Sequence, residues 1–205
     1  MATLTWPEYL IPSKTTWGLQ SNTESFTSPL SRATQTVERP GARWKATLEL
    51  PSMREIDRGV LEAFLASLSG QAGRFFLWPH QRPAAAVTRT VGSPLAITVN
   101  GDVPVNNMKL LHTRGWPVSA LVMRAGEFLQ VGSEFKMVTA DVTSGVDGAC
   151  SLPIAPPLRR VPVASAPVVI DRPCATMMLA NDEYSISVLP GRISDSVVIS
   201  AVEAF

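Results

Sequence analysis

The stretch from Pro40 to Trp78 constrains the fold most, because it holds the one clearly signalled helix of an otherwise β-like sequence. Residues 44–50 alternate between apolar and polar side chains, as a half-buried strand does. Another strand is predicted at residues 74–78. Between them, apolar residues recur at helical spacing: Ile56, Val60, Leu61, Phe64, Leu65 and Leu68. A lone amphipathic helix must cover one face or one open end of a sheet, so we expect a β-rich body with one helix at about residues 53–69.

Local signals predict both ends of this helix. Ser52 and Glu55 have the spacing of a capping box, with Ser52 as the N-cap and Glu55 reaching back. Gly70 is expected to end the helix in the left-handed conformation.

The segment before the helix holds a turn and an anchored N-terminus. Arg39-Pro40-Gly41 matches a type II turn, which predicts a hairpin between residues 34–38 and the strand of residues 44–50. Residues 1–28 are rich in Ser and Thr but contain two tryptophans, which indicates that they lie against a surface. We favour an N-terminal strand docked on its own sheet; the alternative is an arm on a neighbouring subunit.

The middle of the chain consists of short strand-like pieces separated by turns. Asn100-Gly101 and Asp147-Gly148 are strong tight-turn pairs, and Gly132-Ser133 is a weaker one. Many short strands without a helical stretch indicate a small closed barrel. The predicted strands cover residues 87–91, 96–99, 108–112, 121–123, 128–131, 135–142 and 149–154.

The last part of the chain carries further strands and completes the predicted layout. They cover residues 168–170, 175–179, 184–189 and 196–205, and the final one is apolar on both faces, as in a strand buried on both sides. Such a strand needs partners from the first eighty or so residues. We therefore predict a mainly β fold: residues 1–83 plus 164–205 form a discontinuous hub domain, a β-sandwich or split barrel with one helix, and residues 84–163 form an inserted small β-barrel.

The composition of the chain limits which partners it can bind and where in the cell it is expected. Eighteen basic and 17 acidic residues leave a net charge of +1, which predicts no electrostatic attraction to nucleic acid or to a membrane. The apolar runs are too short to cross a bilayer, and the N-terminus lacks a secretory signal, so we expect a soluble protein made in the cytoplasm. Cys150 and Cys174 are expected to be two buried thiols, with one disulfide as the alternative.

No arrangement of residues indicates catalysis. His80 and His112 lack the spacing of a zinc motif. Gly70-Gln71-Ala72-Gly73 is a weak phosphate-loop candidate, but it follows a helix rather than preceding one, so the helix-ending interpretation is favoured. We predict that the chain is not an enzyme and has no catalytic, cofactor-binding or metal-binding residues. The carboxylates are assigned to the polar helix face or to turns: Glu55, Asp57, Glu62, Asp141, Asp147, Asp182, Glu183 and Asp195.

Aromatic residues in the barrel region allow one binding alternative. Trp116 would either stack on a sugar or base, or plug the end of the barrel, which we favour. Phe128 and Phe135 fit core positions. Two or more exposed aromatics along a groove of residues 87–163 would instead indicate carbohydrate binding.

Taken together, several segments resemble the distal tail protein of long-tailed bacteriophages, which joins the last ring of the tail tube to the tip or baseplate. The resemblance covers most of the chain. It rests on the residue types of five segments and on their order along the chain: residues 39–44, 50–53, 70–77, 156–159 and 203–205. Many relatives carry a larger galectin-like C-terminal domain, whereas only about forty residues follow the barrel region here.

The resemblance implies a function and partners. Family members have an N-terminal β-rich hub domain with one helix, form a hexameric ring through it, and in some cases carry an added oligonucleotide/oligosaccharide-binding-like (OB-like) barrel. That barrel would be residues 87–163 here. The family has no catalytic residues to carry over, and we expect no cofactor.

The expected function is that of a structural virion protein at the phage tail tip. Its partners would be further copies of itself, the tail tube protein and the hub or tip proteins, with DNA passing through the ring without specific binding. The first alternative is a carbohydrate-binding accessory module that contacts the host surface. The second is an enzyme with a cleft that gathers His80, His112 and a carboxylate.

Overall fold

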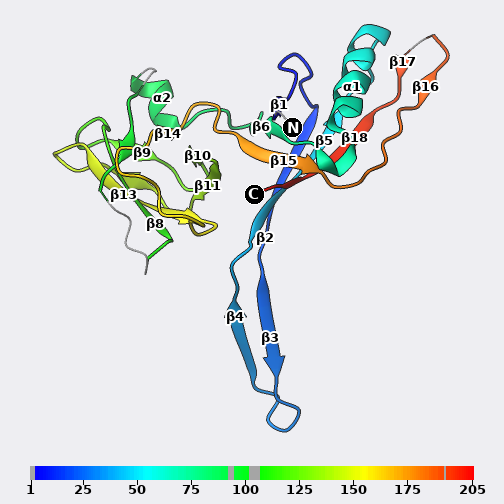
Figure 1. Cartoon of the computed structure of the whole chain (residues 1–205). Helices are drawn as coiled ribbons and strands as arrows, with labels where there is room; N and C mark the ends of the chain where they lie inside the picture. The colour runs from blue at the N-terminus through cyan, green and yellow to red at the C-terminus, as the bar shows by residue number, and fades with distance from the viewer. Residues whose placement is uncertain (1–2, 92–94, 102–106, 192) are drawn as a thin grey trace.

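The computed structural model describes residues 3–91, 95–101, 107–191 and 193–205. Strands hold 41% of the residues and helices 10%, so the predicted mainly β fold is confirmed. Figure 1 shows a sheet that carries one long helix, a compact barrel beside it, and a hairpin that stands away from both.

The first body is a six-stranded sheet, here called the hub sheet, and it joins strands from both ends of the chain. Its strand order is β1 (Leu4–Thr5), β6 (Phe75–Leu77), β15 (Ala175–Leu179), β18 (Val197–Glu203), β5 (Arg43–Leu50) and β2 (Lys14–Gln20). The late strand β18 lies between β15 and the early strand β5, with which it pairs antiparallel. The pairing that a discontinuous hub domain requires is therefore present, and the domain limits themselves stay a proposal.

Helix α1 (Glu55–Leu68) supplies the apolar cover for one face of the hub sheet. The predicted inward side chains of β5 are all buried, and the ring of Phe64 on α1 lies 5.4 Å from Trp6 and 5.6 Å from Phe75. Ile56 is 82% exposed, contrary to the prediction, because the buried face of the helix begins one turn later, at Val60 and Leu61.

The predicted N-cap is wrong by two residues, whereas Gly70 takes the predicted left-handed conformation, with φ 67°. Arg54 is the N-cap and makes no side-chain cap bond; instead, the Met53 amide next to it donates to Ser194 Oγ of β17 (Ile193–Ser194) at 3.0 Å. The start of the helix is thus held by a tertiary bond just outside it, and Ser52 is not its N-cap. At the other end, Ser69 takes the left-handed conformation with φ 52°, one residue before Gly70.

The predicted hairpin between residues 34–38 and β5 is also wrong. Strand β4 (Thr34–Glu38) pairs with β3 (Thr23–Thr27), and β5 pairs with β2 and β18. Gly41, with φ 113°, bends the chain between β4 and β5 without reversing it. The result is one long ribbon in which β2 and β3 run outward and β4 and β5 return.

The second body is a six-stranded sheet that curls into a nearly closed barrel. Its order is β14 (Val168–Val169), β10 (Phe128–Val131), β11 (Glu134–Val138), β13 (Ala149–Ala155), β8 (Leu110–Arg114) and β7 (Thr98–Val99). A bridge between Thr98 and Pro167 joins the two edges of this sheet. The short strands β9 (Leu121–Met123) and β12 (Val142–Thr143) pair with each other.

Several predictions about individual strands need correction. Residues 87–91 lie in helix α2 (Ala86–Val91) rather than in a strand, and the first amide of this helix donates to the Glu127 carboxylate at 2.7 Å. Val168 and Val169, predicted in the hub, pair with β10 and help to close the barrel.

The third correction concerns β18, which is not buried on both faces. Val198 is 61% exposed, because the hub sheet is covered only on the side that carries α1 and the barrel. The predicted strand at residues 184–189 is reduced to β16 (Val188–Leu189), which pairs with β17. The turn predicted at Asn100-Gly101 leads into residues 102–106, which lie outside the described residues.

Barrel and hub sheet meet through an aromatic cluster. Phe128 and Phe135, on the outer face of β10 and β11, pack on Trp17 and Trp44 of the hub sheet with ring centroids 5.2 to 6.2 Å apart. The Trp44 indole Nε1 also donates to the carbonyl of Phe135 at 3.1 Å. Phe128 and Phe135 are buried as predicted, but they are buried between the two bodies rather than inside the barrel.

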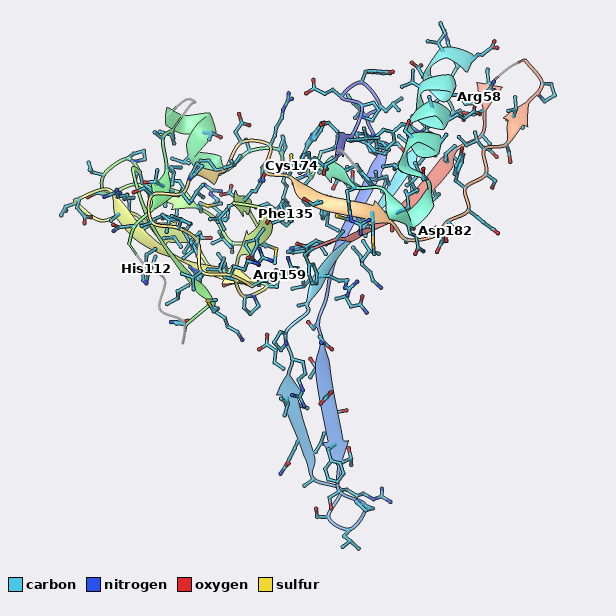
Figure 2. The ribbon with its side chains drawn as sticks, viewed as in Figure 1. Arg58, His112, Phe135, Arg159, Cys174 and Asp182 are labelled. Carbon is cyan, nitrogen blue, oxygen red and sulfur yellow. The ribbon has the colours of Figure 1, made fainter. Side chains whose placement is uncertain are left out.

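A buried ion pair lies beside the aromatic cluster (Figure 2). Both terminal nitrogens of Arg159 donate to the Glu203 carboxylate, at 2.9 and 2.8 Å, and the Trp44 amide donates to it at 3.0 Å. Glu203 is only 2% exposed. The Arg159 guanidinium also lies 3.8 Å from the centroid of the Phe205 ring. Because bidentate charged pairs hold orientation as well as distance, this contact fixes how the barrel sits on the sheet.

A second buried ion pair supports the segment that carries Arg159. The fully buried Lys136 Nζ donates to Glu134 at 2.7 Å and to the Pro157 carbonyl at 2.8 Å. Glu134 in turn accepts the backbone amides of Arg159 and Arg160. Burial lowers the pKa of Lys136, and its hydrogen bond to Glu134 opposes that shift.

Removing Arg159 should cost far more stability than removing an exposed arginine. Arg159→Ala leaves the Glu203 carboxylate buried without its charged partner, so we expect the free energy of unfolding to fall by about 3–5 kcal/mol. Arg39→Ala, which breaks an exposed pair with Glu24, is the control and should change it by less than about 1 kcal/mol. Urea denaturation measures both changes, and equal small losses would show that the Arg159–Glu203 pair does not stabilise the joint.

Candidate assembly site: an exposed arm and the groove at its base

The ribbon beyond the hub sheet, residues 20–40, is here called the arm. Every residue in it except Ser28 is exposed, although β3 and β4 are fully paired with each other. Figure 1 shows the arm reaching away from both bodies. It presents apolar side chains to solvent: Phe26 is 65% exposed, Val37 51%, and Leu30, near the tip, 97%.

The contacts that hold the arm are weak ones. The Arg39–Glu24 pair spans 2.8 Å between two exposed side chains, and such pairs contribute little in water. At the base, Asn22 Nδ2 donates to the Pro40 carbonyl at 2.7 Å, and Lys109 of the barrel pairs with Glu38 at 2.7 Å. A two-stranded ribbon without a covering layer is marginally stable in water. The arm therefore has few contacts that would stabilise it on its own.

The arm continues a free sheet edge. β2 is the last strand of the hub sheet, and among the described residues β3 pairs only with β4, so one side of the backbone from Lys14 to Thr27 carries no strand. Unpaired amides and carbonyls on such an edge are a template for a strand of another chain.

A groove of about 990 Å³ lies where the arm base, the barrel and the last residues meet. Apolar side chains form much of its wall: Pro40, Met108, Pro157, Leu158, Ala204 and Phe205. Arg39 and Arg160 also line it. Phe205 is 70% exposed even though Arg159 stacks on its ring. We call this feature the arm-base groove.

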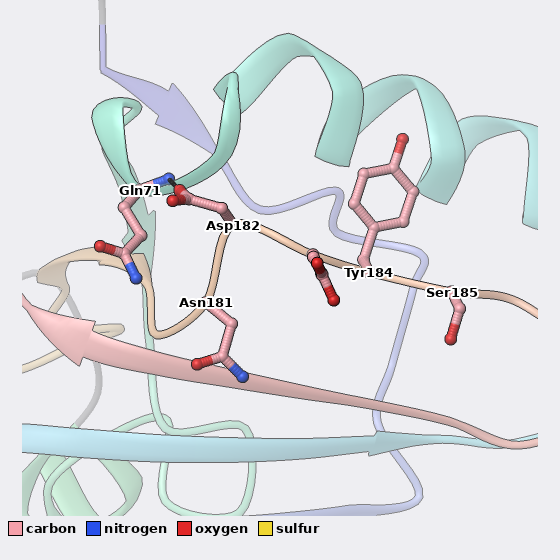
Figure 3. Close-up of a pocket in the computed structure, with 6 residues that line it drawn as sticks. Gln71, Asn181, Asp182, Tyr184 and Ser185 are labelled. Carbon is pink, nitrogen blue, oxygen red and sulfur yellow. Dashed lines mark hydrogen bonds between the residues drawn. The ribbon is translucent and has the colours of Figure 1, made fainter.

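A second hollow, of about 780 Å³, lies between α1 and the segment after β15, and its side chains do not converge (Figure 3). Asn181 points toward β18 and Tyr184 toward α1. Asp182 Oδ1 accepts the Gln71 amide at 2.9 Å, and a Cβ at Gly70 would lie 2.5 Å from the same oxygen. The predicted phosphate-loop candidate thus binds a carboxylate of its own chain, which supports the structural interpretation of residues 70–73.

The structure does not bring the predicted reactive side chains together. His112 Nδ1 lies 2.7 Å from Ser151 Oγ on the barrel, whereas His80 stacks on Trp78 with centroids 4.9 Å apart. Figure 2 shows His112 and Cys174 far apart. Within the described ranges, no three His, Cys, Asp or Glu side chains gather as metal ligands would.

The cysteines, Trp116 and the carboxylates have ordinary structural roles. Cys150 and Cys174 are free and half-buried, and burial raises the pKa of both thiols.

Trp116 is 4% exposed in the barrel core and donates its Nε1 to Thr113 at 2.8 Å, which confirms its role as an internal plug. Glu62 pairs with Arg58, and three aspartates accept nearby backbone amides: Asp141, Asp147 and Asp195.

The sequence analysis did not predict the contact between the barrel and the hub sheet, although the sequence contains two signs of it. Glu203 follows Val197, Ile199 and Ala201 at the inward positions of β18, so it is a charge on a core-facing stripe. Phe128 and Phe135 lie on the outer side of barrel strands, where polar residues are usual. Both features mark a surface that another part of the chain covers.

Comparison with known proteins adds no assignment. No protein-family model matches this sequence, and no curated protein matches it. In the part of the chain that the structure describes, no helix is long and apolar enough to span a membrane.

His80 lies where the chain crosses from the hub sheet to the barrel. Burial there disfavours the protonated, charged form of its ring. Among the described residues, neither ring nitrogen finds a hydrogen-bond partner. Desolvation by burial lowers the pKa of His80 below its usual 6.5, and the Trp78 backbone only partly offsets this. Arg172 lies over the Trp78 ring at 5.9 Å and adds no negative charge that would favour protonation.

Stability should therefore decrease in mild acid. The unfolded chain binds a proton at this histidine at higher pH than the folded protein does, so the free energy of unfolding should fall as the pH drops below about 6.5. His80→Phe keeps a ring against Trp78 and removes the titration, so it should reduce this slope. Urea denaturation at a series of pH values tests it, and identical slopes for the two proteins would contradict the assignment.

Proposed function

We propose that this chain is a structural protein of a long-tailed phage that forms a ring at the distal end of the tail tube and connects the tube to the tip or baseplate. The resemblance described above suggests a hexameric ring. The partners are further copies of the chain, the tail tube protein and the hub or tip proteins. The protein belongs to the virion, at the tail tip.

The observation that carries this proposal is the arm. Twenty of its 21 residues, numbers 20–40, are exposed, and its apolar side chains lie open to solvent among the described residues. Such an element belongs in a contact with another chain. A contact between two different surfaces of one subunit forms a ring when its repeated rotation returns to the starting subunit.

Charge and rigidity support the same proposal. A net charge of +1 suits a ring through which DNA passes without specific binding, because phosphate contacts from Lys and Arg would retain it. The aromatic cluster and the Arg159–Glu203 pair hold the barrel against the hub sheet. Each subunit would then present its arm and its sheet edge in a constant geometry, as a closed ring requires.

The carbohydrate-binding alternative lacks the sign that would favour it. Trp116, Phe128 and Phe135 are all buried, so these barrel aromatics do not line an exposed groove. Neither of the two hollows described above is lined by His80 or His112, so neither supports the enzyme alternative.

The purified protein should form ring-sized oligomers, either alone at high concentration or with its tail partner, and the arm should be required. Replacing residues 22–39 by a short glycine-containing turn removes the arm and should leave a folded monomer. Multi-angle light scattering gives the mass and negative-stain images the shape. His112→Ala, on the barrel, is the control and should assemble like the unchanged protein; a protein that stays monomeric even with the tube or hub partner would contradict the proposal.

A further inference from the structure

We infer that the arm-base groove of one subunit receives the arm tip, residues 28–33, of the next subunit. This inference rests on the proposed ring, and it names the surface that makes the ring close. Leu30 is the side chain that enters the groove.

The arm tip needs a partner from another copy. The strands of the arm are hydrogen-bonded from the Asn22–Arg39 contact at the base to the Thr27–Thr34 pair below the tip. Figure 1 shows this paired ribbon pointing away from the barrel and from the C-terminus, between which the groove lies. Because the ribbon is paired along its length, its tip does not fold back to the groove of its own subunit.

The size of the arm matches a protein–protein contact. A standard interface involves about 20–30 residues on each side. The arm offers residues 20–40, and all but Ser28 are exposed. A contact that used the tip alone would be too small for a stable oligomer, whereas an arm that lies along the neighbour with its tip in the groove reaches the usual size.

The two surfaces also match in chemistry. Leu30 is 97% exposed and is preceded by Pro29 in a turn that Ser28 closes by hydrogen bonds to Arg32 and Ala33. The groove offers Met108, Pro157 and the exposed ring of Phe205. Burying an exposed leucine side chain against such a wall favours association, because it removes apolar surface from water.

The location of the groove explains how the proposed ring closes. It lies at the base of the arm of its own subunit, because residues 38–40 belong to the arm and also line the groove. Each subunit then gives a tip to one neighbour and accepts a tip from the other, at the point where its own arm begins. This is a head-to-tail contact, the type from which rings are built.

A disulfide trap tests the inference on the full chain. In a background with Cys150→Ser and Cys174→Ser, Leu30→Cys is combined with Met108→Cys in the groove. Oxidation should give a ladder of covalent multimers on a non-reducing gel, and mixing the two single variants should give only dimers. The control pairs Leu30→Cys with Ile56→Cys, an exposed residue of α1, and should give no such ladder.

The outcomes separate the groove from the ring. If light scattering shows rings but the Leu30–Met108 pair does not cross-link, or if the Ile56 control links equally well, the groove assignment is wrong and the ring stands. If Leu30→Cys links only to the tube or hub protein, the occupant is a different chain and the inference fails. If no multimers form at all, both proposals fail. As a second measure, Leu30→Asp should raise the concentration needed for assembly at least about tenfold, as expected when a buried apolar contact of roughly 1.4 kcal/mol or more is lost.

Discussion

The arrangement of this protein depends on one buried contact between its two bodies. Four aromatic rings, from Trp17, Trp44, Phe128 and Phe135, bring the outer face of the barrel against the hub sheet, and each such ring buries about 150–250 Å² when fully covered. Rings alone allow sliding, because apolar attraction has little direction. The bidentate Arg159–Glu203 pair and the Trp44 indole bond supply the missing direction. The barrel is therefore held in one orientation rather than carried on a loose pair of linkers.

This joint sets the relative positions of the exposed features. The arm, the free edge of β2 and β3, and the arm-base groove all adjoin it, and the groove is formed partly by the segment that carries Arg159. If the barrel moved freely, the groove would open and close and could not select a partner. In the proposed ring, the contact between barrel and sheet would let each subunit present its arm and its groove at a constant angle. Closed head-to-tail assemblies need that constancy.

Local patterns in the sequence predicted much of the secondary structure. The alternation in β5, the apolar stripe from Leu61 to Leu68 and the exact limits of β9, β10 and β15 follow from side-chain periodicity, which the backbone geometry dictates. Predictions that depended on competing contacts were less reliable. Helix α1 begins after Arg54 rather than after Ser52, next to a bond from the Met53 amide to the distant Ser194. Residues 87–91 form a helix whose first amide donates to the Glu127 carboxylate. The hairpin at Gly41 was misplaced because a glycine in the left-handed region signals a bend without saying which strands pair.

The sequence by itself determined the fold class, the single long helix, the absence of a recognisable catalytic motif and a near-neutral charge, since each of these depends on composition or on neighbours within a few residues. Only the tertiary structure decided which strands share a sheet, that β14 closes the barrel, and that residues 20–40 stand clear of the body. It also decided that Glu203 and Arg159, 44 residues apart, meet in the joint. The physical reason is that such contacts are set by the competition among all buried surfaces of the folded chain, and no window of local sequence contains both partners.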